Sequence, residues 1–271
     1  MTNDATTSAI SRSEIEAALR AQPWFLASDQ AIQDRLLSLP GDDLPKESCN
    51  GYLADLARRP ELGGGVRVRR ILEVLIPKGR IFGILTNIEV EKLSDPTVVF
   101  GYQYFSWRQG PSGGAKGLVF VESDSGEFTH VIILSTFSFA PGRNTNDLPG
   151  GFMEVGDESV LDRFRIEIGE ELGIPGIPLK RIIRLGAYYP DRAMTNFYPE
   201  PLVGVLSPQN AGLIRFGESH NPDVFEMRSI PRMVPIAKLW GDDGLIAASD
   251  DGCFLVCVAR LIAKGILKPP V

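Results

Sequence analysis

Hydrophobic and polar positions follow two different periods along the chain, and the change falls near residue 62. Before it, Ser13 precedes the stretch EIEAALRAQPWFL and Glu16 follows three residues later, a spacing that predicts a capping-box helix start. A second helix is predicted over 31–39. Glycines 63–65 mark a turn into the next part of the chain, so residues 1–62 are expected to form a helical and loop-rich extension.

From residue 66 to about 108 the pattern changes to runs of β-branched and aromatic residues, which predict strands. The turn signals between them are Pro77-Lys78-Gly79 and Ser94-Asp95-Pro96. The runs GLVFVES and THVIILSTFSF then predict a hairpin around Asp124-Ser125-Gly126, and an apolar stripe predicts a closing helix from about 251 to 266. The elements predict an α/β fold.

The domain organisation follows from the same pattern. Residues 1–62 are the helical extension, and 63–271 are expected to form one domain. Within that domain, 63–115 is an N-terminal antiparallel β segment and 116–271 is the core.

Three glutamates gather on one predicted helix in the stretch LPGGFMEVGDESVLDRFRIEIGEELGI, 148–174. Glu167, Glu170 and Glu171 lie at i, i+3 and i+4, so they project from one helix face. Their mutual repulsion would be offset by a divalent cation, and hard carboxylate oxygens suit Mg²⁺ or Mn²⁺. The alternative is a solvated acidic face. The Leu148-Pro149-Gly150-Gly151 turn before the helix has no side chains at its glycines, so its backbone can approach a ligand closely.

This stretch resembles the Nudix box, whose pattern runs Gly, five residues, Glu, seven residues, then Arg-Glu-U-x-Glu-Glu-x-Gly-U, where U is a bulky aliphatic residue. Seven residues separate Glu158 from Ile166, as the pattern requires. The residues that match its closing part are Glu167, Ile168, Glu170, Glu171, Gly173 and Ile174.

The stretch departs from the box at two points. Ile166 stands where the family has arginine, and the gap from Gly151 to Glu158 is one residue too long. A rival register takes Asp157 as the first acid and Arg165 as the arginine, but it needs an extra residue inside the helix. We prefer an extra residue in the loop, where insertions are tolerated.

Arg163 could take the place of the missing box arginine. It lies four residues before Glu167 and seven before Glu170, so it could point along the same helix face. We therefore expect Arg163 to orient these glutamates.

The order of elements resembles the ADP-ribose and nucleotide-sugar pyrophosphatase branch of the Nudix hydrolases. The resemblance implies an α/β/α sandwich with a mixed sheet, and a homodimer built with the N-terminal strands. It implies that Glu167 and Glu171 hold Mg²⁺ or Mn²⁺ together with a turn carbonyl, Gly150 or Gly151, and that Glu170 binds metal or orients water. It also implies a catalytic carboxylate on a later loop. Our first choice is Glu226, followed by Glu218, Asp223 and Glu200.

Other side chains are candidates for binding the substrate. Arg143 and Arg192 could pair with a diphosphate, because guanidinium binds phosphate oxygens in a bidentate manner. Tyr189 could stack on a base or ribose. The alternatives are solvated arginines and an aromatic side chain packed in the core.

The composition of the chain argues against several classes of function. The net charge of −6 gives no electrostatic footprint for nucleic acid. The N-terminus lacks the apolar core of a signal peptide, and no apolar run approaches membrane-spanning length. Three cysteines without a CxxC pair argue against a disulfide framework and favour a cytoplasmic protein. His130 and His220 are the two histidines, which argues against a Ser-His-acid triad and against histidine metal ligands.

The sequence thus predicts a metal-dependent enzyme that hydrolyses the pyrophosphate bond of a nucleoside diphosphate linked to another group, X, of the ADP-ribose or nucleotide-sugar type. Two alternatives stay open. The fold could serve only to bind or sense a nucleotide sugar, as loss of the box arginine favours. It could also be redirected to another reaction, in which the glutamates act without metal.

Overall fold

A computed structural model of the chain describes residues 10–42, 47–59, 61–62, 65–111, 113–138, 141–154, 157–191, 193–220, 229–249 and 251–270. The chain divides into two compact units. Unit 1 consists of residues 1–113 and 191–198, and unit 2 of residues 114–190 and 199–271. The contacts therefore group the residues on both sides of position 62 in one unit.

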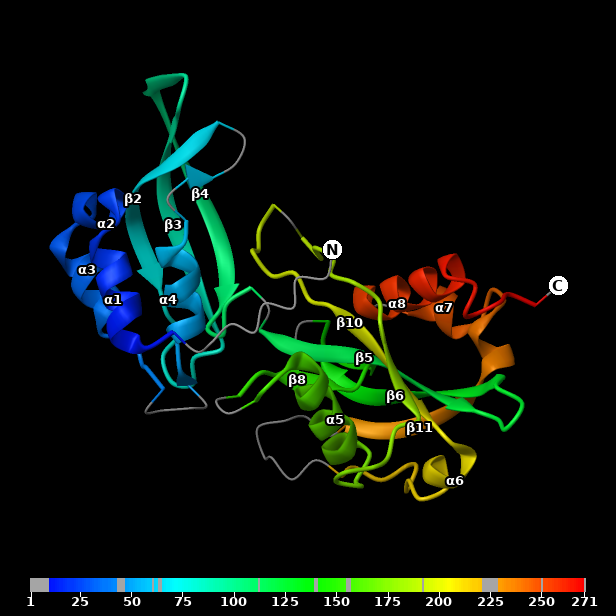
Figure 1. The fold of residues 1–271 in the computed structure, drawn as a ribbon. Coiled ribbons are helices and arrows are strands. Elements are labelled where there is room, and N and C mark those ends of the chain that lie inside the picture. The colour runs from blue at the N-terminus through cyan, green and yellow to red at the C-terminus, as the bar shows by residue number, and fades with distance from the viewer. Residues whose placement is uncertain are drawn as a thin grey trace. The chain divides into compact units, whose positions relative to one another are not determined.

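Unit 1 contains short helices and an antiparallel sheet (Figure 1). Its helices are α1 (Arg12–Arg20), α2 (Pro23–Ala27), α3 (Gln30–Leu37) and α4 (Asn50–Ala57). Its strands, in sheet order, are β1 (Glu61–Leu62), β2 (Val66–Leu75), β3 (Gly83–Lys92) and β4 (Asp95–Trp107).

The start of α1 corrects the predicted cap. Ser11 and Glu14 form the capping box, with the Ser11 backbone N–H donating to Glu14 Oε2 at 2.8 Å. The prediction of Ser13 and Glu16 was wrong by two residues because the serine-to-glutamate spacing occurs twice in this stretch. The helix begins at Arg12, and Ile15 and Leu19 are buried on one of its faces.

One face of the unit 1 sheet is apolar and the other is polar. Ile84, Ile88 and Val90, at alternate positions of β3, join the buried cluster that includes Leu19 and Phe25 of the helices. On the opposite face, ion pairs such as Arg67 with Glu91 and Arg70 with Glu89 bridge β2 and β3. The helices therefore cover a single face of this sheet.

Unit 2 is built on a mixed sheet with the order β11-β6-β5-β10-β9, in which β7 pairs with β6 and β8 with β5. β10 runs parallel to β5, whereas the other pairings are antiparallel. The strands are β5 (Gly114–Glu122), β6 (Phe128–Ser138), β7 (Arg143–Asp147), β8 (Gly150–Phe152), β9 (Arg181–Arg184), β10 (Pro201–Leu206) and β11 (Ser229–Pro235). The helical segments are α5 (Val160–Glu171), α6 (Pro208–Ala211), η2 (Ile236–Leu239), α7 (Leu245–Ala248) and α8 (Gly252–Ala263).

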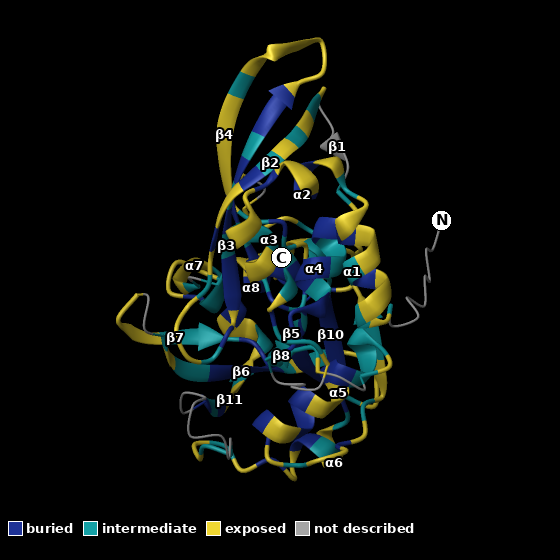
Figure 2. Cartoon of the chain, turned by 90° about the vertical axis from the view of Figure 1, so that its left-hand side faces the viewer, coloured by how far each residue is buried: buried dark blue, intermediate teal, exposed yellow. Residues whose placement is uncertain are grey.

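Helices cover both faces of this sheet. Leu118 and Phe120 of β5 pack in one buried cluster with Phe254 of α8. Val119, between them, packs in a second cluster with Phe164 of α5. β10 is buried along its whole length, as a strand between two helical layers must be (Figure 2). This confirms the predicted α/β/α sandwich with a mixed sheet.

The described residues contain no helix long and apolar enough to cross a membrane.

The ion pairs of Glu122, the last residue of β5, lead to a prediction about the stability of unit 2. Its carboxylate is 4% exposed and pairs with Arg181 and with Lys180 Nζ at 2.5 Å. The hydrogen bond from Arg181 brings the pKa of Glu122 down to about 2. A lowered pKa stabilises the fold above the unfolded-state value and loses that effect as the pH falls toward 2. Glu122→Gln is therefore expected to cost about 1–3 kcal/mol of unfolding free energy at pH 7.

Denaturant unfolding at pH 7 and pH 3, with exposed Glu127→Gln as the control, tests this expectation. The difference between wild type and Glu122→Gln should shrink at pH 3. An equal loss at both pH values would contradict the ion-pair explanation.

Candidate functional site

The predicted glutamate helix is α5, and its start is fixed locally. Ser159 is its N-cap, and the Ser159 hydroxyl donates to Asp162 Oδ2 at 2.5 Å. The helix is continuous from Val160 to Glu171, so the rival register, which needs an extra residue inside it, is wrong. Arg165 points to solvent and pairs with Asp162 at 2.8 Å. Asp157 instead accepts the Glu154 backbone N–H at 2.6 Å in the preceding turn.

Arg163, Glu167 and Glu171 form a buried stripe along α5, four residues apart. Their exposed fractions are 9%, 6% and 9%. Arg163 Nε donates to Glu167 Oε1 at 2.7 Å, and a second nitrogen of the same guanidinium donates to the same oxygen. Burial alone would lower the pKa of Arg163, but the charge of Glu167 outweighs it and raises that pKa. The helix thus places a permanent cation against its innermost glutamate.

The guanidinium of Arg163 also faces two other carboxylates. Its nitrogens lie 3.7 Å from Glu154 Oε2 and 3.7 Å from Glu170 Oε2. Sequence reasoning missed Glu154, which precedes the helix in the loop and carries no spacing signal. That Arg163 orients the glutamates during a reaction stays a prediction.

The glycine turn contacts the glutamates from β8. The Gly150 backbone N–H donates to Glu171 Oε2 at 2.9 Å. A Cβ placed on Gly151 would lie 1.9 Å from Glu167 Oε1. Both buried carboxylates therefore lie directly against the backbone of Gly150 and Gly151, which only glycine permits at the second position.

These contacts predict different effects for the two glycines. A Cβ on Gly150 would lie 2.3 Å from the Ala115 carbonyl oxygen and 2.6 Å from Lys116 Cα. That clash is with backbone, so Gly150→Ala is expected to cost about 1–3 kcal/mol or more of stability. Gly151→Ala displaces the side-chain carboxylate of Glu167 rather than backbone, so we expect less loss of stability but about 10-fold weaker Mn²⁺ binding.

Thermal unfolding and calorimetric Mn²⁺ titration of both variants check the contrast, with Gly101→Ala in β4, where an added Cβ would meet no atom within 4 Å, as a general glycine control. Unchanged Mn²⁺ binding in Gly151→Ala would show that the position of Glu167 does not matter for the metal.

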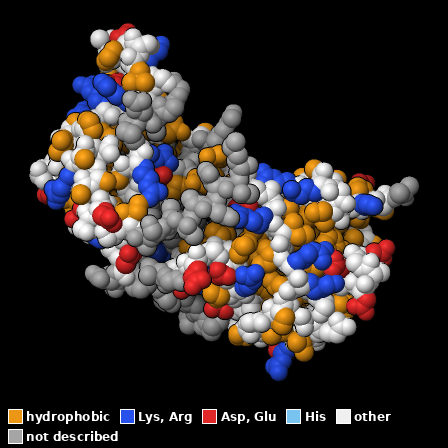
Figure 3. Space-filling model, in the orientation of Figure 1, with side chains coloured by type: hydrophobic (Ala, Val, Ile, Leu, Met, Phe, Trp, Pro, Cys, Tyr) orange, Lys and Arg blue, Asp and Glu red, His pale blue; other side chains and the backbone are white. Residues whose placement is uncertain are grey.

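The site has the chemistry for a divalent cation. Asp and Glu side chains gather over the part of unit 2 that holds β8 and the start of α5 (Figure 3). Within the described ranges, there is no group of three His, Cys, Asp or Glu side chains that could hold a metal ion. Mg²⁺ does not require one, because it usually keeps several waters and takes one or two protein carboxylates. Glu167 and Glu171 fit that role.

The other predicted site residues fall in several places. Arg143 begins β7 and Tyr189 follows β9, and both side chains are exposed. Glu218 is exposed, and Glu200 pairs with Arg184 at 2.5 Å. Arg192, Asp223 and Glu226 lie outside the described residues. The roles of all these residues in substrate binding or proton transfer stay predictions.

A second polar cluster in unit 2 was missed entirely. Lys116 Nζ lies 2.5 Å from Asp147 Oδ1 and 2.7 Å from Asp251 Oδ2. Burial alone would lower the pKa of Lys116, but the two carboxylates outweigh it and raise that pKa. The three residues are far apart in the sequence, and only the cap position of Asp251 at the predicted closing helix gave a local signal.

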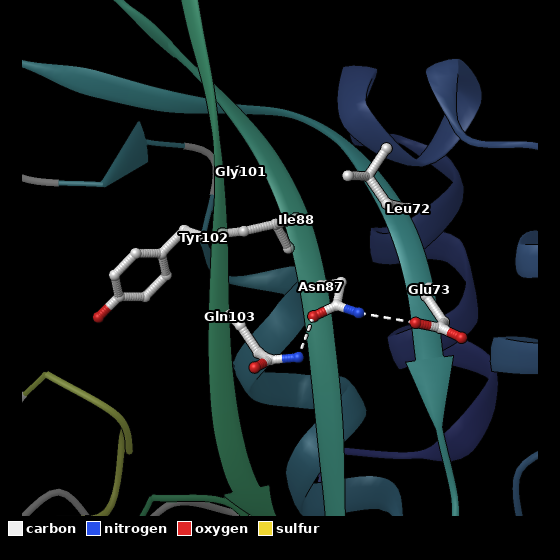
Figure 4. Close-up of a pocket in the computed structure, with 7 residues that line it drawn as sticks. All are labelled: Leu72, Glu73, Asn87, Ile88, Gly101, Tyr102 and Gln103. Atoms are coloured by element: carbon white, nitrogen blue, oxygen red, sulfur yellow. Dashed lines mark hydrogen bonds between the residues drawn. The ribbon is translucent and has the colours of Figure 1, made fainter.

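Two surface cavities are lined by other residues. One, of about 580 Å³, is in the unit 1 sheet, where Asn87 hydrogen-bonds Glu73 at 2.7 Å and Gln103 at 2.6 Å across three strands (Figure 4). The other, of about 450 Å³, is an apolar groove in unit 2 between η2, α7 and α8. Neither is lined by a predicted site residue.

Comparison with known proteins gives a weak likeness of fold. A solved crystal structure of an ADP compounds hydrolase is 15% identical, with a TM-score of 0.45, and the match covers 73% of this chain and 96% of that chain. No protein-family model and no curated protein matches the sequence. At this identity and TM-score the likeness says nothing about the substrate of the present chain.

Proposed function

We propose that unit 2 hydrolyses the pyrophosphate bond of a nucleoside diphosphate linked to a group X, of the ADP-ribose or nucleotide-sugar type. The observation that carries the proposal is the pair of buried carboxylates, Glu167 and Glu171, held against the glycine backbone of β8. Burying two like charges side by side is costly, and a solvated structural face has no need of it. The resemblance of 148–174 to the Nudix box supports the same chemistry.

Each residue of the site would have a role that follows from its position. Glu167 and Glu171 would hold Mg²⁺ or Mn²⁺, with a turn carbonyl of Gly150 or Gly151. When bound, the metal would neutralise the diphosphate and make water more acidic. Glu170 is the exposed member of the set, with a side chain 51% accessible, so it can reach a solvent water and orient it. Arg163 would keep Glu167 in place.

Arg143 and Arg192 are the proposed partners of the diphosphate, and Tyr189 of the base or ribose. Glu226 is the proposed base on the later loop. Each assignment rests on residue type and place in the sequence.

One observation favours a second candidate. Arg163 already supplies positive charge to Glu154, Glu167 and Glu170, which is what a metal would otherwise supply. The glutamates could therefore serve a metal-independent reaction on a similar metabolite, or binding alone.

The deciding experiment is an assay of nucleoside monophosphate release from ADP-ribose and a panel of nucleotide sugars. The full chain is assayed with Mg²⁺, with Mn²⁺ and with a chelator present. Release that requires the metal supports the proposed hydrolase and ranks its substrates. Turnover that persists in chelator would instead support the metal-independent enzyme, and binding of a panel member without turnover would support the sensor.

A further inference from the structure

Lys116, Asp147 and Asp251 join three elements at one point of unit 2. Lys116 lies in β5, Asp147 ends β7, and Asp251 is the N-cap of α8. The ammonium of Lys116 bridges the two carboxylates at 2.5 and 2.7 Å. The second oxygen of Asp251 accepts the backbone N–H groups of Cys253 at 2.6 Å and Phe254 at 3.1 Å. A strand, a strand end and a helix start are therefore tied together by one cation.

The same residues hold both ends of the glycine turn. Asp147 Oδ1 accepts the Leu148 backbone N–H at 2.7 Å, where the turn begins. Lys116 pairs with Gly150 in the β5–β8 register, where the turn ends. Between them, the Gly117 N–H donates to the Pro149 carbonyl at 3.0 Å. The turn is thus attached to β5 at Pro149 and Gly150, and to Asp147 of β7 at Leu148.

The cluster and the glutamates lie on opposite faces of the sheet. Lys116 shares the α8 face with Leu118 and Phe120, because alternate residues of a strand point the same way. Glu171 lies on the α5 face and reaches the turn through the Gly150 N–H. The backbone of the turn connects the cluster to Glu171, through the Gly150 N–H.

We propose that Lys116, Asp147 and Asp251 are positioning residues that fix the Gly150 N–H where it holds Glu171. The relevance of this to metal binding rests on the proposed function. The alternative is that the cluster only stabilises the cap of α8, as buried ion pairs often stabilise a fold. The two explanations differ in one expected result. Only the first predicts that removing the cluster loosens the glycine turn more than the rest of unit 2.

The test compares Lys116→Met with Glu122→Gln in the full chain. Glu122 lies on the same strand and also takes part in an ion cluster, but it contacts β9 rather than the turn. The readout is hydrogen exchange of the Gly150 amide measured by NMR, relative to amides of β10, followed by Mn²⁺ titration. We expect exchange at Gly150 to be about 10-fold faster in Lys116→Met and unchanged in Glu122→Gln, with Mn²⁺ affinity about 10-fold weaker.

Asp251→Asn is the second variant, because asparagine keeps the helix cap and loses the charge that Lys116 pairs with. It should also speed exchange at Gly150, by a smaller factor. Equal effects of Lys116→Met and Glu122→Gln at Gly150, or a change shared with the β10 amides, would overturn the proposal. Hydrogen exchange needs neither metal nor substrate. If the protein cleaves no panel member but the Gly150 amide still loses its protection selectively, the positioning role is supported and the proposed hydrolase activity is contradicted.

Discussion

Replacing Arg163 by methionine should destabilise unit 2 by about 3–5 kcal/mol at pH 7, because it leaves the Glu167 carboxylate buried without its cation. The pair is enclosed, with side chains only 11% and 7% exposed. Methionine keeps most of the length and packing of the arginine stem, so the loss reports mainly on charge. Chemical denaturation at pH 7 measures it.

Arg165→Met is the matched control, two positions along the same helix. Arg165 also pairs with a carboxylate on α5, but both side chains are about half exposed, at 55% and 44%. Loss of this exposed ion pair in Arg165→Met should lower the free energy of unfolding by less than about 1 kcal/mol. Similar costs for the two variants would show that burial does not distinguish the pairs.

The pH dependence of Arg163→Met separates charge from packing. Protonation of the stranded carboxylate removes its charge, so the loss of unfolding free energy caused by the substitution should be smaller in acid than at pH 7. A cost that is constant with pH would point to lost packing around the guanidinium instead.

The sequence predicts the parts of the fold that carry their own local signal. Runs of β-branched residues located most strands of both sheets, and the i, i+3, i+4 spacing placed the glutamates on one face of α5. Short elements carry too few residues to show a period, which is why β8 was not predicted. The helix α4 was also missed, although it is as long as the predicted α3. The cap of α1 shows the same limit, since two equal serine-to-glutamate spacings competed and the local pattern does not choose between them.

Some contacts of the candidate site could be predicted from the sequence and others could not. The pairing of Arg163 with Glu167 follows from helix geometry, so it could be anticipated from a spacing of four residues. The contacts of Gly150 with Glu171 and of Lys116 with Asp251 join elements that are distant in sequence. Their geometry depends on how β5, β8 and α8 pack, and no local pattern encodes that.

Glu171→Gln should reduce metal-dependent hydrolysis by about 100-fold or more while leaving the fold intact. Glutamine keeps an oxygen that can accept the Gly150 N–H, so the contact at 2.9 Å can persist. It removes the negative charge that would hold the metal. The substitution also relieves repulsion between Glu171 and Glu167, so stability should be unchanged or slightly higher, the opposite of Arg163→Met.

Turnover, Mn²⁺ affinity and unfolding free energy are measured together for Glu171→Gln, with Glu127→Gln as a control on an exposed turn. Loss of turnover and Mn²⁺ affinity at unchanged stability would assign Glu171 to the metal, because a structural carboxylate would affect stability first. Wild-type Mn²⁺ affinity in Glu171→Gln would remove Glu171 from the metal site, and the pairing of Arg163 with Glu167 would then be a structural contact of α5.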